Sequence, residues 1–263
     1  MKKIKTILKK EWKEVFKNRM VLFSVVFLPL ILTAIPLGIL IGLGNDTAIS
    51  ATDAEMPEQF NAFCPPSLQG GECFQVFMIS QFMVMFMLVP LAIPATIAAY
   101  SIVGEKSNRS LEPLLATPIS TSELLIGKSL AAVIPAVLAT FAAFAIFVVG
   151  SWIIVSNQQL FLALIDARWL LAILVVGPLM ALMAVMVSVM VSSRVNDPRA
   201  AEQISMVVIL PVLAVFFGQV SGIFIVNSKF VLLSALVLTG IDLVLVYMAV
   251  RLFQRETILT RWK

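Results

Sequence analysis

The 263-residue chain contains no histidine. Without histidine it can form neither a Ser-His-Asp triad nor the paired-histidine zinc site of an HExxH metalloprotease, and it has no imidazole proton relay. An intramembrane aspartyl protease needs two facing carboxylates, whereas the apolar part of this sequence contains one deep acid, Asp242. The sequence therefore gives no support for catalysis by this chain.

Charge is also scarce, since only 13% of the residues are charged, against about 25% in a soluble domain. Hydrophobic residues make up 60%, and the mean hydropathy is +1.01. Apolar blocks long enough to cross a hydrocarbon core of about 30 Å lie at 20–43, 74–103, 124–149, 169–192, 204–226 and 230–251. Because lipid offers the backbone no hydrogen-bond partner, such blocks should be helical. The sequence predicts an all-α membrane protein with six transmembrane helices.

The basic residues alternate between the segments that join these blocks. Seventeen of the 19 Lys and Arg lie in residues 1–19, 104–129, 193–203 and 251–263, while the alternate segments contain only Arg168 and Lys229. The positive-inside rule then places both termini and residues 104–129 in the cytoplasm. The net charge of +4 is explained by this topology, with anionic lipid rather than nucleic acid as the expected partner.

Residues 1–19 combine a basic run with an apolar stripe formed by Ile4, Ile7, Leu8, Trp12, Val15 and Phe16. This spacing predicts an amphipathic interfacial helix, with the stripe against lipid and the lysines on the opposite face. The apolar block that follows is longer than the core of a signal peptide, so we expect an uncleaved span. The predicted organisation is an interfacial helix at 1–19, one transmembrane domain at 20–251 and a cytoplasmic tail at 252–263.

The two cysteines of the chain, Cys64 and Cys73, both lie in the predicted external loop at 44–73. In an oxidising compartment a structural disulfide between them is favoured over two free thiols. A zinc site is less well supported, because two thiolates without histidine make a poor cage.

Gly127, Lys128 and Ser129 match the last three positions of the phosphate-binding loop pattern G-x-x-x-x-G-K-[ST]. The first glycine of that pattern is replaced by Ser122, and the residues before Gly127 read as a helix. Ser120 and Glu123 form a capping box that would open this helix. We therefore predict no ATP site here, and we expect Lys128 to snorkel towards the membrane surface.

The polar stretch GEKSNRSLEPLLATP, residues 104–118, predicts a short amphipathic helix. Leu111, Leu114 and Leu115 share one face, Pro113 suits a first helical turn and Pro118 ends the segment. A helix this short needs a surface to dock on. The residues alone leave two interpretations open, a connector lying on lipid or a contact for a soluble partner.

Three of the polar residues inside the apolar blocks are candidates for a substrate pathway, Asp242, Gln81 and Gln219. A charge at the bilayer centre costs about 2.5–3.5 kcal/mol on insertion scales, so Asp242 is a candidate for a substrate pathway, or else a protonated carboxyl bonded to a neighbouring helix. The two glutamines are further pathway candidates, although glutamine also joins helices. Met78, Met83, Met85 and Met87 could form an adaptable apolar surface or simply pack.

The run GEKSNRSLEPLLATPISTSELLIGK, between the second and third blocks, resembles the cytoplasmic signature of type-2 ATP-binding-cassette export permeases. SSRVNDPRAAEQ, residues 192–203, followed by Pro211, is similar to the sodium-extrusion and multidrug branch of that family. The resemblance implies that residues 109–118 are the coupling helix, docking in a groove of a separate nucleotide-binding subunit. The implied partner-coupling residues are Glu105, Arg109, Leu111, Glu112, Pro113, Leu114, Leu115, Pro118 and Glu123.

The same resemblance implies the membrane subunit of an ATP-driven exporter of a small molecule or ion, in a prokaryotic plasma membrane. This chain would bind no cofactor, and ATP and Mg would be held by the partner ATPase subunits, two of which would assemble with two permeases. Two alternatives remain, an ion-coupled secondary transporter using Asp242 and a non-transporting membrane scaffold.

Overall fold

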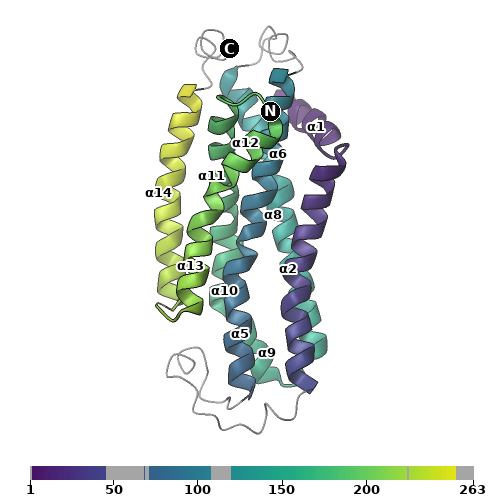
Figure 1. Ribbon diagram of the computed structural model, residues 1–263, viewed down its shortest axis with the longest axis vertical. Helices are drawn as coiled ribbons and strands as arrows, with labels where there is room; N and C mark the ends of the chain where they lie inside the picture. The colour runs from purple at the N-terminus through teal and green to yellow at the C-terminus, as the bar shows by residue number, and fades with distance from the viewer. Residues whose placement is uncertain (1, 46–67, 69–70, 108–119, 224, 253–263) are drawn as a thin grey trace.

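We obtained a computed structural model that describes residues 2–45, 68, 71–107, 120–223 and 225–252. Within these ranges the chain is helical, without strands, and the long helices stand side by side in an elongated bundle (Figure 1). The helix α1 and the end of α14 lie at the upper end of the bundle in Figure 1, together with the end of α6 and the start of α8.

The helices follow one another in the order α1 (Lys2–Val15), α2 (Arg19–Asn45), α5 (Gly71–Phe86), α6 (Leu88–Ser107), α8 (Thr121–Ile154), α9 (Gln158–Leu164), α10 (Ala167–Leu171), the π-helical turn η1 (Ala172–Val176), α11 (Gly177–Ser192), α12 (Pro198–Ser205), the 3-10 turn η2 (Met206–Ile209), α13 (Leu210–Val220) and α14 (Ser228–Leu252). Six helical stretches are long and apolar enough to cross a membrane: Val21–Leu43, Gly71–Glu105, Ser122–Ile154, Gln158–Ser192, Pro198–Val220 and Ser228–Leu252. The six-helix all-α prediction is confirmed, although several helices extend beyond the apolar blocks.

The second span is divided into α5 and α6 at Met87. Pro90 lies four residues after Phe86, and a proline clashes with the carbonyl four residues before it and donates no hydrogen bond. At the break the backbone tightens, and Met87 N donates to Val84 O at 3.1 Å. The proline thus explains why a continuous apolar block becomes two helices.

The bundle core surrounds α6 and α11, which pack against each other and against α8. In the part of the core remote from α1, three aromatic rings pack together. The Trp169 ring stacks on the Phe147 ring with 5.0 Å between the ring centroids, and it meets the Phe86 ring edge-on with 5.3 Å between the centroids. The outer helix α14 packs on α11 through one stripe, while its other face exposes Leu233 and Leu236. An exposed apolar face on a span of this length is the surface expected to meet lipid.

The helix α1 lies against the bundle, and this corrects the expectation that its apolar stripe faces lipid. Ile7 and Val15 are buried. The Trp12 indole Nε1 donates to Ala131 O in α8 at 3.0 Å. Gly127 of α8 gives the room for this approach, because a Cβ at that position would lie 2.8 Å from Ile7 Cγ2. The stripe therefore binds protein as well as defining an amphipathic helix.

Candidate functional site

A buried charged cluster joins α1, α6 and α8 at the upper end of the bundle. Lys128 Nζ lies 2.9 Å from Glu11 Oε1 and 2.9 Å from Glu105 Oε2. The side chains of these residues are only 2 to 6% exposed. The prediction that Lys128 snorkels to the membrane surface is therefore wrong. The lysine points into the protein because α1 and α6 each place a carboxylate beside it.

Ser101 and Lys10 complete this cluster. The Ser101 hydroxyl donates to Glu11 Oε2 at 2.5 Å and accepts from Lys128 Nζ at 2.9 Å. Lys10 Nζ donates to Glu105 Oε1 at 2.7 Å. Burial, the largest single effect, would lower the pKa of Lys10, but its hydrogen bond to Glu105 and the nearby carboxylates together raise that pKa above its usual value. In this cluster opposite charges meet within hydrogen-bond distance, which offsets part of the cost of burying them.

The charged cluster holds both flanks of residues 108–119. Glu105 lies in the last turn of α6, directly before this segment, and Lys128 lies in the second turn of α8, after it. Lys3 of α1 also approaches Glu123 of α8, at 3.8 Å. A single helix, α1, therefore contacts the chain on each side of the predicted coupling helix.

The start of α8 has the predicted capping box. Ser120 Oγ accepts from Glu123 N at 3.2 Å, and Glu123 Oε2 accepts from Ser120 N at 2.9 Å. The GKS triplet therefore lies inside a helix, without the glycine-rich loop that phosphate binding requires. Of the implied coupling residues, the structure describes the positions of Glu105 and Glu123. Outside the described residues lie Arg109, Leu111, Glu112, Pro113, Leu114, Leu115 and Pro118.

The run at 192–203 forms the short helix α12 and its approach. Asp197 caps the helix by accepting from Ala200 N at 2.9 Å, and Pro198 occupies the first turn. Glu202 accepts a hydrogen bond from Thr96 of α6 at 2.7 Å. This motif is therefore tied to the same helix that carries Glu105.

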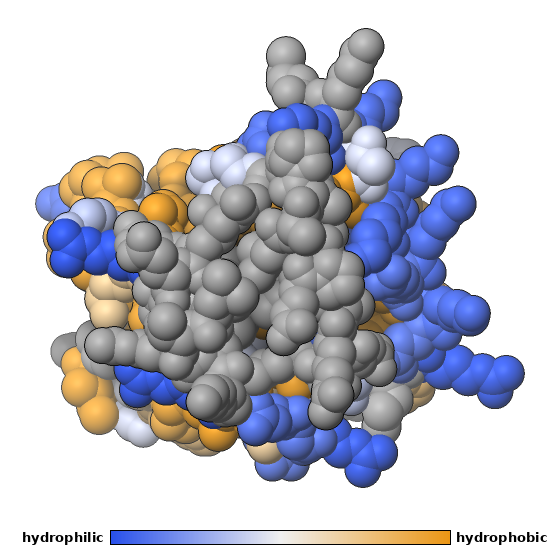
Figure 2. All heavy atoms as spheres, turned by 90° about the horizontal axis from the view of Figure 1, so that it is seen from above, coloured by the Kyte–Doolittle hydropathy of each residue, from blue (hydrophilic) through white to orange (hydrophobic). Residues whose placement is uncertain are grey.

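Strongly hydrophilic side chains gather on one edge of the upper end of the molecule, on the side where α1 lies (Figure 2). Lys5, Lys9 and Lys13 of α1 are exposed there. This face of α1 is opposite to the buried one, so the helix carries a basic surface outward and a charged, apolar surface inward. The basic surface fits contact with anionic lipid headgroups.

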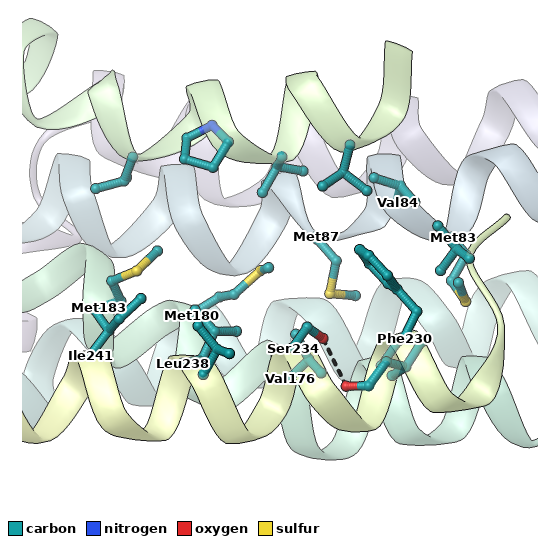
Figure 3. A pocket seen from close by; sticks show the side chains of 18 residues that line it. Met83, Val84, Met87, Val176, Met180, Met183, Phe230, Ser234, Leu238 and Ile241 are labelled. Carbon is teal, nitrogen blue, oxygen red and sulfur yellow. Dashed lines mark hydrogen bonds between the residues drawn. The ribbon is translucent and has the colours of Figure 1, made fainter. Parts of the chain in front are cut away.

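An apolar cavity of about 330 Å³ lies near the middle of the bundle, between α5, α11, α13 and α14. Four methionines, two from α5 and its break and two from α11, point into it (Figure 3). They are Met83, Met87, Met180 and Met183. Of the methionines noted in the second span, Met78 and Met85 are not among the lining residues. The methionines that line this cavity therefore come from two different spans.

The three predicted pathway residues come from different helices, Gln81 from α5, Gln219 from α13 and Asp242 from α14. They are 6%, 3% and 3% exposed. In the part of the chain that the structure describes, their side-chain polar atoms have no hydrogen-bond partner. None of the three lines the methionine cavity. All three side chains are buried without a polar contact in the described part of the chain. Burying a polar group in this way costs free energy unless another group hydrogen-bonds to it.

Residues 5–248 match the family described as "ABC-2 family transporter protein". This match covers most of the chain. The chain belongs to the ABC-2 transporter family.

A similar curated protein is the "ABC transporter permease protein NatB" of Bacillus subtilis (strain 168), which is 31% identical over 147 residues. The alignment covers 53% of this ABC-2 chain and 37% of the Bacillus protein. The chain thus matches little more than a third of that relative's length.

Several site residues of this ABC-2 chain are not evident from sequence alone. The position of Glu11 in the sequence could have indicated that it faces the protein, because it lies four residues from both Ile7 and Val15 and so falls on the apolar stripe. No sequence pattern indicates the contacts of Thr96, Ser101 and Glu202, because their partners are remote in sequence.

The structure describes only one of the two cysteines of the predicted external loop. Cys73 is buried in the first turn of α5 and is disulfide-bonded. Cys64 lies outside the described residues, so the pairing of Cys64 with Cys73 stays a prediction. Across the described ranges, no group of three metal-binding side chains comes together.

Proposed function

We propose that this chain is the membrane-spanning permease subunit of an ATP-driven exporter. A separate nucleotide-binding subunit would bind and hydrolyse ATP, and this chain would carry the transported molecule or ion across the membrane. Membership of the ABC-2 family supports the transporter assignment. The observation that carries the coupling proposal is the charged cluster that holds both flanks of residues 108–119.

In this proposal residues 109–118 form the coupling helix and dock on the ATPase subunit. When the ATPase dimer closes, the docked helix moves, and the end of α6 and the start of α8 move with it. Because Glu105 and Lys128 are tied to Glu11 and Lys10, α1 moves as part of the same unit. Buried ion pairs restrict the geometry because breaking one leaves an unpaired charge away from water. The cluster would transmit the motion into the bundle instead of letting the flanks yield.

The motion can spread further through α6. The Thr96 to Glu202 hydrogen bond connects α6 to α12, and α12 begins the fifth span. A displacement of α6 would therefore reach α13, and the packing of α11 on α6 would carry it to α14. These are the helices that supply Gln219 and Asp242, which we propose to lie along the transport pathway with Gln81.

The proposed orientation places α1, the end of α6 and the start of α8 at the cytoplasmic side of the plasma membrane. The support is the asymmetry of Lys and Arg between alternate connecting segments. We further propose that two permease subunits pair in the working transporter. A cargo in the sodium-extrusion or multidrug class is part of the same proposal and is supported by the sequence resemblance at residues 192–203.

The test is to purify the full chain with its native partners and identify an ATPase by mass spectrometry. Leu115→Asp should abolish co-purification of that ATPase, because a charge on the apolar face of the coupling helix prevents docking. Ser122→Asp is the matched control, since Ser122 is exposed at the start of α8 and an acidic residue suits a helix N-terminus. Retention of the ATPase by Leu115→Asp, with reconstituted transport intact, would contradict the proposal.

The ion-coupled secondary transporter and the non-transporting scaffold are less well supported, because the family is one of ABC transporters. The same reconstitution separates them. A secondary transporter would move solute without any ATPase, and a scaffold would show no substrate-stimulated ATP hydrolysis in the complex.

A further inference from the structure

The methionine cavity lies at a level of the bundle where the surrounding solvent is lipid. All of its described lining residues except Val226 belong to four helical stretches long and apolar enough to span a membrane. Its volume of about 330 Å³ is at the lower end of the range for ligand pockets, roughly 300 to 1,000 Å³. The cavity is therefore large enough for a bound group and not a packing defect of one methyl.

The cavity opens towards the lipid-facing side of the bundle. Val237 and Ile241 line it and are also 54% and 40% exposed on α14. Their neighbour Leu236, which is 67% exposed, continues the same outer face. On the α13 side, Pro211 both lines the cavity and is exposed. The rim is thus continuous with the surface that meets the bilayer.

The part of the lining that the structure describes offers no free group to hold a polar ligand. Among the residues that the structure describes, the one polar side chain of the lining belongs to Ser234, and that hydroxyl already donates to Val231 O within α14 at 2.7 Å (Figure 3). The lining residues in the described ranges include no ionisable side chain. Water does not stably fill an apolar cavity, and an empty one deprives its lining atoms of dispersion contacts. An apolar hydrocarbon group therefore suits this lining better than water or a polar ligand.

We propose that this cavity binds an acyl chain of a membrane phospholipid. The chain enters between α13 and α14 and lies against Met83 and Met87, while the headgroup stays outside. Methionine suits this role, because its unbranched, polarisable side chain fills irregular space around a flexible hydrocarbon. The bound chain would fill the gap between α14 and the helices α5 and α11. This site is separate from the charged cluster and from the proposed pathway residues.

The test uses the full-length chain in nanodiscs that contain a phospholipid with a photoreactive diazirine in one acyl chain. After illumination, mass spectrometry maps the labelled residues. Lipid around any membrane protein labels exposed side chains such as Trp152 and Ile153, which are 69% and 73% exposed. Met83 and Met87 are each 4% exposed, so ordinary surrounding lipid does not reach them. We expect both to be labelled in the unaltered protein.

Ser234→Phe should fill the cavity and abolish labelling of Met83 and Met87 while labelling of Trp152 continues. Leu233→Phe is the matched control, because Leu233 is the adjacent residue, is 60% exposed and does not line the cavity. Ser234→Ala keeps the cavity open and should keep the labelling. If Ser234→Phe fails to fold, Val237→Phe at the rim tests the same blockage.

Two results would overturn the proposal. One is labelling of Trp152 and Ile153 without Met83 or Met87 in the unaltered protein. The other is labelling that appears in discs with one chain and disappears in discs with two, which would assign the cavity to contact with a second copy. The discs contain no ATPase and no transported solute, so the result does not depend on the export proposal.

Discussion

Lys128 and Glu11 are 117 residues apart in the sequence, yet their side chains meet at 2.9 Å with almost no exposure to solvent. Glu105 meets the same lysine at 2.9 Å. One buried cation therefore serves two carboxylates from two other helices. This arrangement fixes α1 against the two helices that flank the predicted coupling helix.

Removal of this cation should be costly. Lys128→Met leaves Glu11 and Glu105 buried without their cation, and breaking a buried pair in this way typically costs about 3–5 kcal/mol. We expect a large loss of thermal stability, measured by fluorescence-detected size exclusion after heating. The matched control is Lys3→Met, because Lys3 is exposed and its partner Glu123 is half-buried, so this change should alter stability little. A Lys128→Met protein as stable as the control would show that the cluster is not structural.

The contact between α1 and α8 depends on Gly127. Gly127→Ala places a Cβ 2.8 Å from Ile7 Cγ2, near the root of a branched side chain that cannot swing away. We expect destabilisation of about 1–3 kcal/mol, in the range of overpacked sites. Gly104→Ala in α6 meets nothing within 4 Å and should instead stabilise, by up to about 1 kcal/mol from helix propensity. Unfolding midpoints of the two variants should move in opposite directions, and movement in the same direction would argue against close packing at Gly127.

The capping box sets where α8 begins. Ser120→Ala removes the acceptor for Glu123 N and should cost about 0.5–2 kcal/mol, as at other helix N-caps. Hydrogen exchange of the amides in the first turn of α8 should quicken. Ser120→Asp keeps an acceptor and should restore slow exchange. Unchanged exchange in Ser120→Ala would mean that the tertiary contacts alone hold this turn.

We expect Asp242 to lower the stability of the fold while it serves transport. Its carboxylate oxygens have no hydrogen-bond partner in the described part of the chain, so Asp242→Leu should raise the unfolding temperature by removing a buried polar group. If Asp242 lies on the transport pathway, the same variant should lose export in reconstituted vesicles. Thr239→Leu, at an exposed position of α14, is the control and should leave both unchanged. Full export by Asp242→Leu would remove this residue from the pathway.

The proposed orientation predicts which end of the bundle faces the cytoplasm. A cysteine introduced as Lys5→Cys should resist a membrane-impermeant maleimide in intact cells and react after the cells are opened. Gln159→Cys, at the start of α9 and the opposite end, should react in both conditions, and the unaltered chain gives the background. Reaction of Lys5→Cys in intact cells would place α1 outside and remove the coupling helix from contact with ATP hydrolysis.

The sequence alone determined the features that depend on composition and on neighbours within one helical turn. Apolar length and the needs of backbone amides in lipid predicted the six spans, and the Ser120 and Glu123 pair predicted the start of α8. Pro90 accounts for the break between α5 and α6, because its effect reaches only four residues back.

Only the tertiary structure decided which face of each helix meets which partner. The periodicity of α1 defined an apolar stripe but could not say whether lipid or protein would cover it, and for the same reason Lys128 was assigned to the membrane surface. The stripe meets α8, and the lysine meets Glu11 and Glu105. The methionine cavity likewise combines residues of four helices. Such contacts join remote residues, and no local pattern encodes them because lipid and protein interior are equally apolar to a single helix.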